Sequence, residues 1–454
     1  MPEANANPEK RFFIQLITRD IALDDAILDL IDNSVDSLVR SKDIDIYRDF
    51  IKDEHEQGDV LAEIRINCTS KTFKIEDNCG GITFENAERD VFRFGRPDPN
   101  KRMSLSVFGI GMKRAIFKIG RKIEMESHAI DSGFHMNLDV CEWMDMHTED
   151  WRIPIERLEG AADETKAGTK IVISRLNEEI SDVIKAPTFA NQLFRKIQAA
   201  YPFYIGKYLN IFINEKRIPE KDLIFSQSSD HQPNIETWED GNVKITLMCG
   251  FLPRGDDIQT QWTTEKSGWY LVCNGRVVVH ANKTSLTGWG LKRILPQFMP
   301  KNRGFLGIVF FSSSNPEELP WNTTKRGINS ESGVFLRTRM RMITASRPVL
   351  QFQDKMYRSK DTDDVREEYR DSVKKMDTVS ATKQAAERAS AKDPIPSQRY
   401  LFPQPSAHPK MSTIKYEVKE EDINRVKKGL GRSSMYNYEV GQKTFKYYMD
   451  RECS

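Results

Sequence analysis

The residues with the clearest chemical potential lie in the segment LDDAILDLIDNSVDS (23–37), which is crowded with aspartates. Aspartate is a poor residue for a helix interior, so this density needs a reason other than solubility. Asp29 and Asn33 are four residues apart and therefore share one helix face. A carboxylate and an amide oxygen there can meet a magnesium ion and a water, and the carboxylate can orient the water beside a phosphate. The alternative is an acidic surface helix.

A second candidate is the turn in KIEDNCGGIT (74–83), which follows a predicted strand. Gly80 and Gly81 let the backbone approach a flat ligand closely. Asp77 lies where the strand enters the turn, and an ionised carboxylate only accepts hydrogen bonds. It could accept one from the exocyclic amino group of adenine and reject guanine, which presents a carbonyl at that position. The alternative is an ordinary Asp-Asn-Gly turn.

A third candidate is SVFGIGMKRAIFKIG (106–120), where Gly109 and Gly111 precede a predicted helix. Helix N-termini offer unpaired N–H groups to phosphates, and Lys113 adds a cation. The alternative is a flexible loop before a helix. A Gly-Thr pair also opens the predicted strand AGTKIVI (167–173), and this pair carries little information alone.

The elements that must position these residues form an α+β pattern over the first 180 residues. Helical spacing predicts one helix over 12–40, a helical segment over 84–94 and a short helix over 109–119. Alternation predicts a hairpin over 62–76 and strands near 122–128, 134–140 and 168–174. The polar stretch 95–106 indicates a loop between two of the helices.

A second α/β unit is expected to begin near residue 186. It opens with a helix, and strands follow at 209–214, 243–251, 268–279 and 305–312, with an Asn-Gly turn at Asn274-Gly275. A charged helical stretch begins near 330. Residues 354–394 indicate a solvated helix or a partly disordered linker, 393–410 a Pro-rich linker, and 411–454 a small basic-aromatic tail.

Composition limits the class of protein. The chain has 454 residues, 39% hydrophobic and 30% charged, with a net charge of +1, which suits globular domains and leaves any nucleic-acid surface to a local patch. No run of 18 apolar residues predicts a membrane span, and the N-terminus has no signal-like apolar region. The six scattered cysteines suggest neither zinc nor disulfides, so a reducing cytoplasmic location is expected.

In their order along the chain, these segments resemble the GHKL ATPases: gyrase, the heat-shock chaperone, histidine kinases and MutL. Asp29 through Asn33 resembles the family's E-x-x-x-N box, which implies a general base at Asp29 and magnesium at Asn33. Asp for Glu shortens the arm by one methylene. Residues 77–81 resemble the adenine motif D-x-G-x-G, with Cys79 in place of the middle glycine. Loop 95–108 would be the lid. The nucleotide-binding residues that the resemblance implies are Asn33, Asp36, Asp77, Gly81, Gly109, Ile110, Gly111, Met112, Lys113 and Thr169.

Within this superfamily the chain looks most similar to MORC-type ATPases, through FGIGMKRAIFKIG and the run AAYPFYIGKYLNIFINEKRI (199–218). The resemblance covers roughly residues 12–345 and implies a Bergerat-type α/β sandwich ATPase domain (1–180) and a transducer-like α/β domain (186–345). A charged and Pro-rich linker (346–410) and a charged helical C-terminal tail (411–454) would follow. In such proteins the second domain returns a lysine to the γ-phosphate, and ELPWNTTKRGIN (318–329) makes Lys325 the candidate.

The resemblance therefore implies Mg²⁺-dependent ATP binding and hydrolysis, with ATP-driven homodimerisation near DNA and no membrane partner. Basic-aromatic segments at 292–305 and 424–449 suit phosphate contacts and base stacking, or are simply solvated faces. Two other functions stay open. One is a non-catalytic ATP-binding switch or assembly module, for which Asp29 and Cys79 leave room. The other is a chaperone-like ATPase with protein clients.

Overall fold

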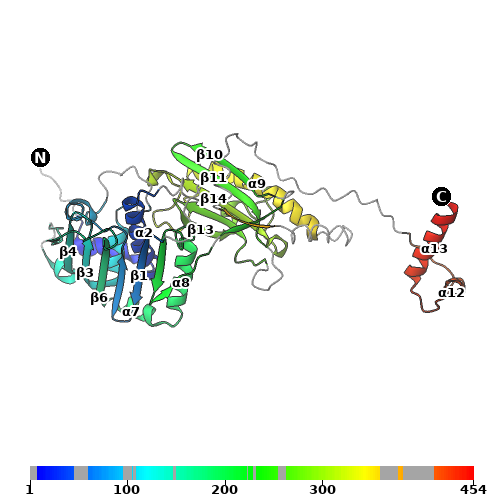
Figure 1. Cartoon of the computed structure of the whole chain (residues 1–454), viewed down its shortest axis with the longest axis horizontal. Helices are drawn as coiled ribbons and strands as arrows, with labels where there is room; N and C mark the ends of the chain where they lie inside the picture. Colours follow the sequence, from blue (N-terminus) through cyan, green and yellow to red (C-terminus); the bar gives the residue numbers. More distant parts are fainter. Residues whose placement is uncertain are drawn as a thin grey trace. The chain divides into compact units, whose positions relative to one another are not determined.

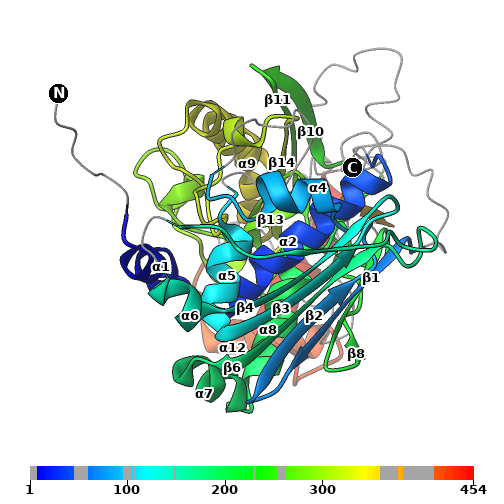
Figure 2. The same cartoon turned by 90° about the vertical axis from the view of Figure 1, so that its left-hand side faces the viewer.

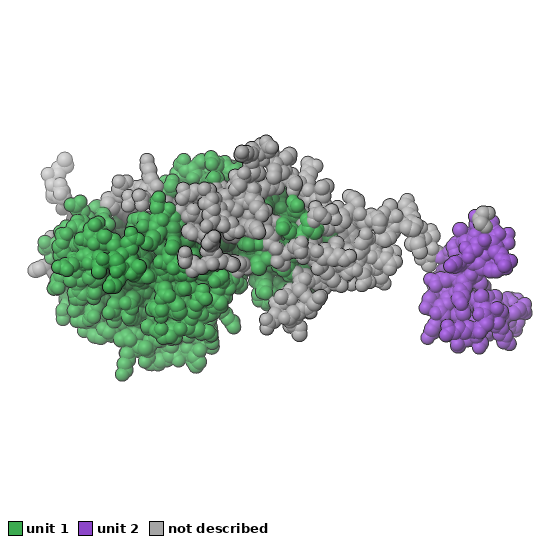
Figure 3. Space-filling view, in the orientation of Figure 1, with its two compact units in different colours: residues 1–403 green, residues 404–454 purple. Residues whose placement is uncertain are grey.

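The computed structural model of the chain describes residues 8–44, 60–95, 105, 109–146, 150–221, 223–228, 232–253, 262–357, 377–381 and 414–453. These residues fall into two compact units, residues 1–403 and 404–454, which Figure 3 colours separately. The larger unit is a mixture of helices and two large sheets, in agreement with the α+β class expected from the sequence.

The first sheet has eight strands in the order β5-β4-β3-β6-β2-β1-β7-β8 (Figure 1). Neighbouring strands are antiparallel except for β1 and β7, which are parallel. Its strands are β1 (Ala62–Cys68), β2 (Thr72–Asp77), β3 (Gly120–His128), β4 (Gly133–Asp139), β5 (Glu156–Leu158), β6 (Gly168–Leu176), β7 (Leu209–Ile213) and β8 (Lys216–Arg217).

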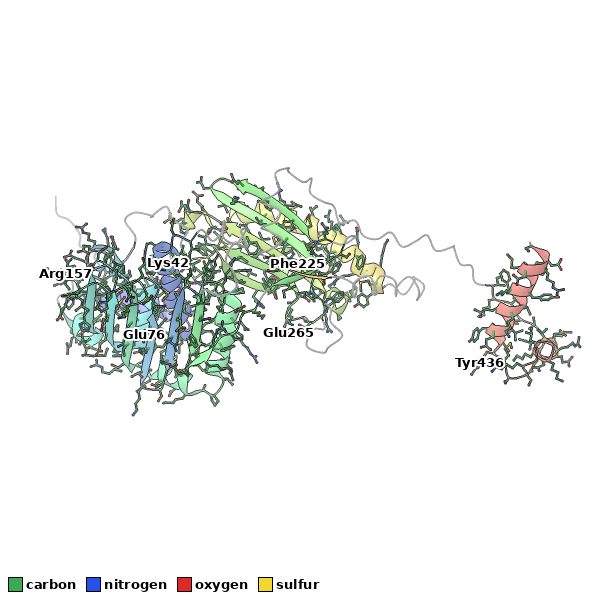
Figure 4. The ribbon with its side chains drawn as sticks, viewed as in Figure 1. Lys42, Glu76, Arg157, Phe225, Glu265 and Tyr436 are labelled. Carbon is green, nitrogen blue, oxygen red and sulfur yellow. The ribbon has the colours of Figure 1, made fainter. Side chains whose placement is uncertain are left out.

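One face of this sheet is buried and the other is polar, as the alternation in β2 illustrates. Phe73 and Ile75 are buried, whereas Lys74 and Glu76 point to the other face, where Glu76 is labelled in Figure 4. The period of two in the sequence therefore places Asp77, which follows Glu76, back on the covered side.

Helices α2 (Leu23–Ser41) and α5 (Gly111–Ile119) cover the buried face and pack against each other (Figure 2). Most residues of α2 are buried, including Asp25, Asp29 and Asp32, so the expectation of an exposed acidic helix is wrong. A helix that lies between a sheet and other elements has no face exposed to water. Each buried aspartate on it therefore needs a hydrogen-bond donor or a cation beside it.

The single helix predicted over 12–40 is wrong, because the chain forms α1 (Lys10–Arg19) and then α2, with a break at residues 20–22. The Thr18 hydroxyl donates a hydrogen bond to the carbonyl of Ile14, one turn earlier, at 2.7 Å, and such bonds often bend helices. Asp20 is the C-cap residue of α1. Asp24 and Asp25 then occupy the first turn of α2, where negative charge is favourable.

The remaining short elements of the first half lie beside this sheet. The predicted helical segment 84–94 begins correctly but ends at Val91 and includes a π-helical turn. These elements are α4 (Phe84–Asn86), η1 (Ala87–Val91), α6 (Val140–Asp145), α7 (Glu178–Lys185) and α8 (Phe189–Ala200).

The second sheet has seven strands in the order β13-β12-β14-β11-β9-β15, with β10 paired to β11. Every residue of β12 and β14 is buried, so both faces of the sheet are covered there. Its strands are β9 (Ile224–Gln227), β10 (Asn234–Asp240), β11 (Val243–Phe251), β12 (Gly268–Cys273), β13 (Arg276–Asn282), β14 (Phe305–Ser312) and β15 (Asp377–Ser380).

Helix α9 (Gly333–Tyr357) packs on β11 and β14 and runs across residue 345, where the transducer-like domain was expected to end. Likewise β7 and β8 complete the first sheet although they follow residue 186. Three short 3₁₀ helices connect these elements: η3 (Ser285–Thr287), η4 (Pro300–Asn302) and η5 (Pro316–Glu318).

In the second unit the structure describes α12 (Glu420–Gly429) and α13 (Asn437–Glu452). Their buried apolar residues are Met435 and Val440, whereas Tyr436 is exposed (Figure 4). The predicted linker, 346–410, lies mostly outside the described residues. Within the described part of the chain, no helix combines the length and apolar character that a membrane crossing requires.

Candidate functional site

A cavity of about 440 Å³ lies between α2, α5 and the first sheet. All the site residues predicted from the sequence line it except Gly81, whose neighbour Ile82 does. Its lining residues are Asp29, Leu30, Asn33, Ser34, Asp36, Ser37, Arg40, Ile75, Asp77, Ile82, Asn86, Asp90, Val91, Gly109, Ile110, Gly111, Met112, Lys113, Arg114, Met125, Thr169, Ile171, Thr323 and Lys325. Below, the Asp77 end means Asp77 with residues 79–82, 127 and 169, and the Lys325 end means Asp29, Asp32, Arg114, Arg276 and Lys325.

Asp77 has a fixed orientation because both carboxylate oxygens accept hydrogen bonds. Ser34 donates to Oδ2 at 2.6 Å and the backbone N–H of Cys79 donates to Oδ1 at 3.0 Å. Burial raises the pKa of the Asp77 carboxyl, and the hydrogen bonds from Ser34 and Cys79 offset part of that shift. An acceptor held in this way at the cavity wall suits an amino group on a ligand.

Two serines of α2 donate hydrogen bonds to the turn that follows Asp77. Ser37 donates to the carbonyl of Gly81 at 3.2 Å and Ser41 to the carbonyl of Cys79 at 3.1 Å. Gly81 has φ +65°, and a Cβ there would lie 2.0 Å from the carbonyl oxygen of His128, so only glycine fits. The departure from the glycine pattern at Cys79 is accommodated as a buried thiol, and burial raises its pKa well above the ordinary value.

Thr169 lies opposite Asp77 on the neighbouring strand β6, and its side chain pairs with Ser127, a residue that sequence reasoning missed. The two hydroxyls are 2.8 Å apart, and Ser127 accepts a hydrogen bond from the N–H of Ile82 at 2.9 Å. Ser127 is fully buried on β3, beside the start of β6. It therefore ties the glycine turn to the strand that carries Thr169.

The glycine segment before α5 has the geometry expected of it. Gly109 has φ +62°, and Gly111 is the first residue of α5, so the helix N-terminus points at the cavity wall. The Lys113 ammonium donates to the carbonyls of Val91 at 2.8 Å and Arg93 at 2.6 Å. In this structure Lys113 therefore holds the segment that precedes the predicted lid.

The predicted lid, 95–108, lies almost wholly outside the described residues, Gly95 and Leu105 being the described ones. Leu105 is buried and its backbone N–H donates to Oδ1 of Asp36. Asp36 is thus a point at which α2 contacts this loop.

Asp29 and Asn33 share the cavity-facing side of α2. The Asn33 amide nitrogen donates to the Asp29 carbonyl at 2.9 Å, and the amide oxygen is the atom of this side chain whose chemistry suits a metal ion. Arg114, which the sequence did not single out, donates from Nε to Asp29 Oδ2 at 2.6 Å. A Cβ at Gly111 would lie 3.7 Å from the other oxygen, Oδ1, so that oxygen faces the α5 N-terminus.

At the Lys325 end, the buried Asp32 accepts hydrogen bonds from three side chains in the second half of the larger unit. The Lys325 ammonium is 2.7 Å from Oδ2 of Asp32, and the Arg276 guanidinium pairs with the same oxygen. Tyr201 donates to Oδ1 at 2.7 Å. Burial is the largest influence and would lower the pKa of Arg276, but the nearby Asp32, Tyr201, Asp29 and Asp25 together outweigh it and the pKa is raised.

These residues fit a nucleotide and a hard cation. The cavity volume lies within the range of roughly 300–1,000 Å³ usual for small-molecule sites. No cluster of three or more His, Cys, Asp or Glu side chains occurs among the described residues. Magnesium at nucleotide sites typically takes one or two protein oxygens and completes its shell with phosphates and water, which Asn33 can satisfy.

Comparison with known proteins gives one finding. Residues 21–169 match the sequence model of the histidine kinase-, DNA gyrase B-, and HSP90-like ATPase family. The match supports placing this part of the chain in the GHKL superfamily, and it spans every lining residue of the cavity except Ile171, Thr323 and Lys325. No curated protein matches the chain.

Proposed function

We propose that this chain binds ATP in the cavity and hydrolyses it. The observation that carries the proposal is that several separate segments of the chain converge on this cavity. They place a carboxylate at the Asp77 end and a cation at the Lys325 end. Asp77 accepts a hydrogen bond from the adenine amino group, and the 6-carbonyl of guanine offers no donor at that position.

The triphosphate extends from Asp77 towards the N-terminus of α5 and Lys325. Backbone N–H groups at Gly109–Gly111 and the Lys325 ammonium offset its negative charge. Asp29 orients the water that attacks the γ-phosphate, from a position beside the α5 N-terminus. Asn33 would hold Mg²⁺, which supplies charge neutralisation across the phosphates when bound.

A specific observation favours a second candidate, the non-catalytic switch. Arg114 occupies one oxygen of Asp29, so that oxygen is already engaged within the protein and is not available to orient a water. In this alternative the chain binds ATP, changes its assembly state and releases the nucleotide unhydrolysed.

The resemblance to MORC-type ATPases extends the proposal to a cytoplasmic protein that dimerises on ATP and acts near DNA. The exposed aromatics and lysines of α13 support the DNA part, because aromatic rings stack on bases and cations contact phosphates. Exposed Lys292 and Arg293 add a basic segment on the larger unit. A chaperone-like role with protein clients is the remaining alternative.

Calorimetry of the purified chain with ADP and with a non-hydrolysable ATP analogue, each with Mg²⁺, tests binding. Saturable uptake of both is expected, and no uptake by folded protein would overturn the proposal. Release of phosphate from ATP over many turnovers then separates the two candidates: sustained release supports hydrolysis, and binding without release supports the switch.

Size measurement in the presence of ADP or the ATP analogue, with and without duplex DNA, tests the assembly part. We expect a doubling of mass with the analogue alone and a salt-sensitive DNA complex. A monomer in every condition would remove ATP-driven dimerisation from the proposal. DNA binding that is absent at low salt would favour the chaperone-like alternative.

A further inference from the structure

Asp32 is fully buried in α2, and its three donors all come from the chain after residue 186. Tyr201 follows α8, Arg276 begins β13, and Lys325 lies in the loop before α9. Oδ1 accepts from Tyr201, and Oδ2 accepts from both Arg276 and Lys325. Asp32 therefore joins α2, which lines the cavity, to three segments of the second half.

One carboxylate, Asp32, meets two cations, and the charges of Asp29 and Asp25 also act on Arg276. The side chains of Arg276 and Lys325 are 4% and 7% exposed, so water does little to screen either charge. Arg276 alone neutralises Asp32. Lys325 is the additional cation, and of the three donors it is the one that lines the cavity.

The backbone around Lys325 is held by its own hydrogen bonds. Asn322 organises this turn: its carbonyl accepts from the N–H of Lys325 at 2.9 Å and its side chain from the N–H of Arg326 at 3.0 Å. Lys325 sits at φ +56°, and Arg326 pairs with Asp25 of α2 at 2.9 Å. The Lys325 ammonium can therefore change partner through side-chain torsions while the turn stays in place.

We infer that Asp32 competes with the third phosphate of ATP for Lys325. The inference rests on the proposed function and defines how the same site distinguishes ATP from ADP. With ADP, Lys325 remains on Asp32. With ATP, the ammonium transfers to the γ-phosphate, and Asp32 keeps Tyr201 and Arg276, so no buried charge is left unpaired. The preference for ATP over ADP is then set by the difference in free energy between the contact of Lys325 with the γ-phosphate and its contact with Asp32.

The transfer also has a structural consequence. The Asp32–Lys325 pair is one of the contacts that hold the loop before α9 against α2, and the Arg326–Asp25 pair beside it is another. When Lys325 moves to the phosphate, the loop before α9 loses its direct contact with Asp32 of α2 and contacts the nucleotide instead. The larger unit can therefore respond to the third phosphate and not to adenine alone.

The test is the ratio of the dissociation constants for ADP and a non-hydrolysable ATP analogue, measured by calorimetry in full-length Asp32→Asn. Removing the competing charge should raise this ratio by about tenfold, because a hydrogen bond to a charged group typically contributes enough free energy for a change of that size. If both affinities fall together and the ratio is unchanged, Asp32 is purely structural and the inference is wrong. Absence of any nucleotide binding in the wild-type chain would instead defeat the proposed function, so the two failures are distinguishable.

Asp32→Asn leaves Arg276 buried without its charge partner, so this variant can fail to fold. The double variant Asp32→Asn with Arg276→Gln removes both charges together and should show the same rise in the ratio. Tyr201→Phe is the matched control, since it removes a neutral donor that stays on Asp32 in both states, and its ratio should equal that of the wild type.

A double-mutant cycle with Lys325→Met completes the test. Asp32→Asn should have no effect on the ratio once Lys325 is replaced, because the lysine is the group for which Asp32 competes. A tenfold rise that persists in the Lys325→Met background would show that Asp32 acts independently of Lys325 and would overturn the inference.

Discussion

The two ends of the cavity are built by different physical means. At the Asp77 end, hydroxyls and backbone groups make short hydrogen bonds among α2, β2, β3 and β6, all within residues 34–169. At the Lys325 end, buried charges from α2, α5, β13 and the loop before α9 pair with one another. The first arrangement rests on hydrogen bonds between neighbouring elements, and the second on pairs of opposite charges.

The comparison teaches which changes each end can tolerate. Hydrogen bonds between close, rigid elements fix one geometry and discriminate by fit. Charges on long side chains can exchange partners when a stronger anion arrives. Under the proposed function, damage to the Asp77 end should affect every adenine nucleotide equally, and damage to the Lys325 end should separate ATP from ADP, or binding from turnover.

The largest effect is expected from Asp29→Asn. Loss of the oriented carboxylate should lower multiple-turnover phosphate release by about 10²- to 10⁴-fold while nucleotide affinity is retained. Asp24→Asn is the matched control, because Asp24 is on the same helix but pairs with Lys196 outside the cavity lining. Circular dichroism checks that the loss of the Arg114 pair has not unfolded the variant. Unchanged phosphate release would remove Asp29 from the mechanism.

Gly81→Ala should follow, and it tests how rigid the Asp77 end is. The left-handed backbone costs about 1–2 kcal/mol for alanine, and the overlap with the carbonyl of His128 adds about 1–3 kcal/mol. Gly241→Ala is the control, because Gly241 has φ +63° with open space around the Cβ position. Urea unfolding should therefore give a larger loss for Gly81→Ala. Equal losses would mean that the turn moves away and the Asp77 end is not rigid.

Asp77→Ala should weaken the binding of ADP and of the ATP analogue together, by about ten- to a hundredfold, since a charged acceptor is lost. Glu76→Ala, the neighbouring residue on the opposite face of the sheet, should bind both nucleotides as the wild type does. Calorimetry measures both. Selective loss of one nucleotide would contradict the assignment of this end to the adenine ring.

The smallest effect concerns stability and pH. Burial raises the pKa of Asp77 in the folded protein, so the folded state holds this proton more tightly than the unfolded state does. The resulting stability is present below the unfolded pKa of about 3.9 and is lost as pH rises through the folded pKa. Asp77→Asn should therefore unfold at a higher urea concentration than the wild type at neutral pH, with the difference shrinking towards pH 4. A difference independent of pH would contradict the burial effect.

The sequence predicted the locally encoded parts of the cavity lining better than the buried charge pairs at the Lys325 end, for a physical reason. The helix face with Asp29 and Asn33, the glycine turn and the α5 N-terminus are local features, and their residues are encoded by spacing within one element. Lys325 was found through a resemblance and not through its surroundings. The Asp32–Arg276 pair joins residues 244 positions apart, and no periodicity carries that information.

The same distinction explains the errors in the fold. The break at residues 20–22 lets α1 and α2 each pack against α5, and helical spacing does not encode that packing. The partnership of Ser127 with Thr169 required the register of β3 against β6. Most of the longer strands were predicted, whereas β5, β8, β9, β10 and β15 were not, and spacing did not predict the order of the strands within each sheet.

The parallel pairing of β1 with β7 has a consequence for biosynthesis. Ala62 aligns with Leu209 and Ile66 with Ile213, so one edge of β1 stays without its neighbour until residues 209–213 have left the ribosome. At 5–20 residues per second this interval lasts roughly 7–30 s. During that time the nascent chain presents an open strand edge, a known route to misassembly. A polypeptide that stops near residue 180 would keep this edge permanently, because the sheet that supports the cavity is completed only when residues 209–217 have been made.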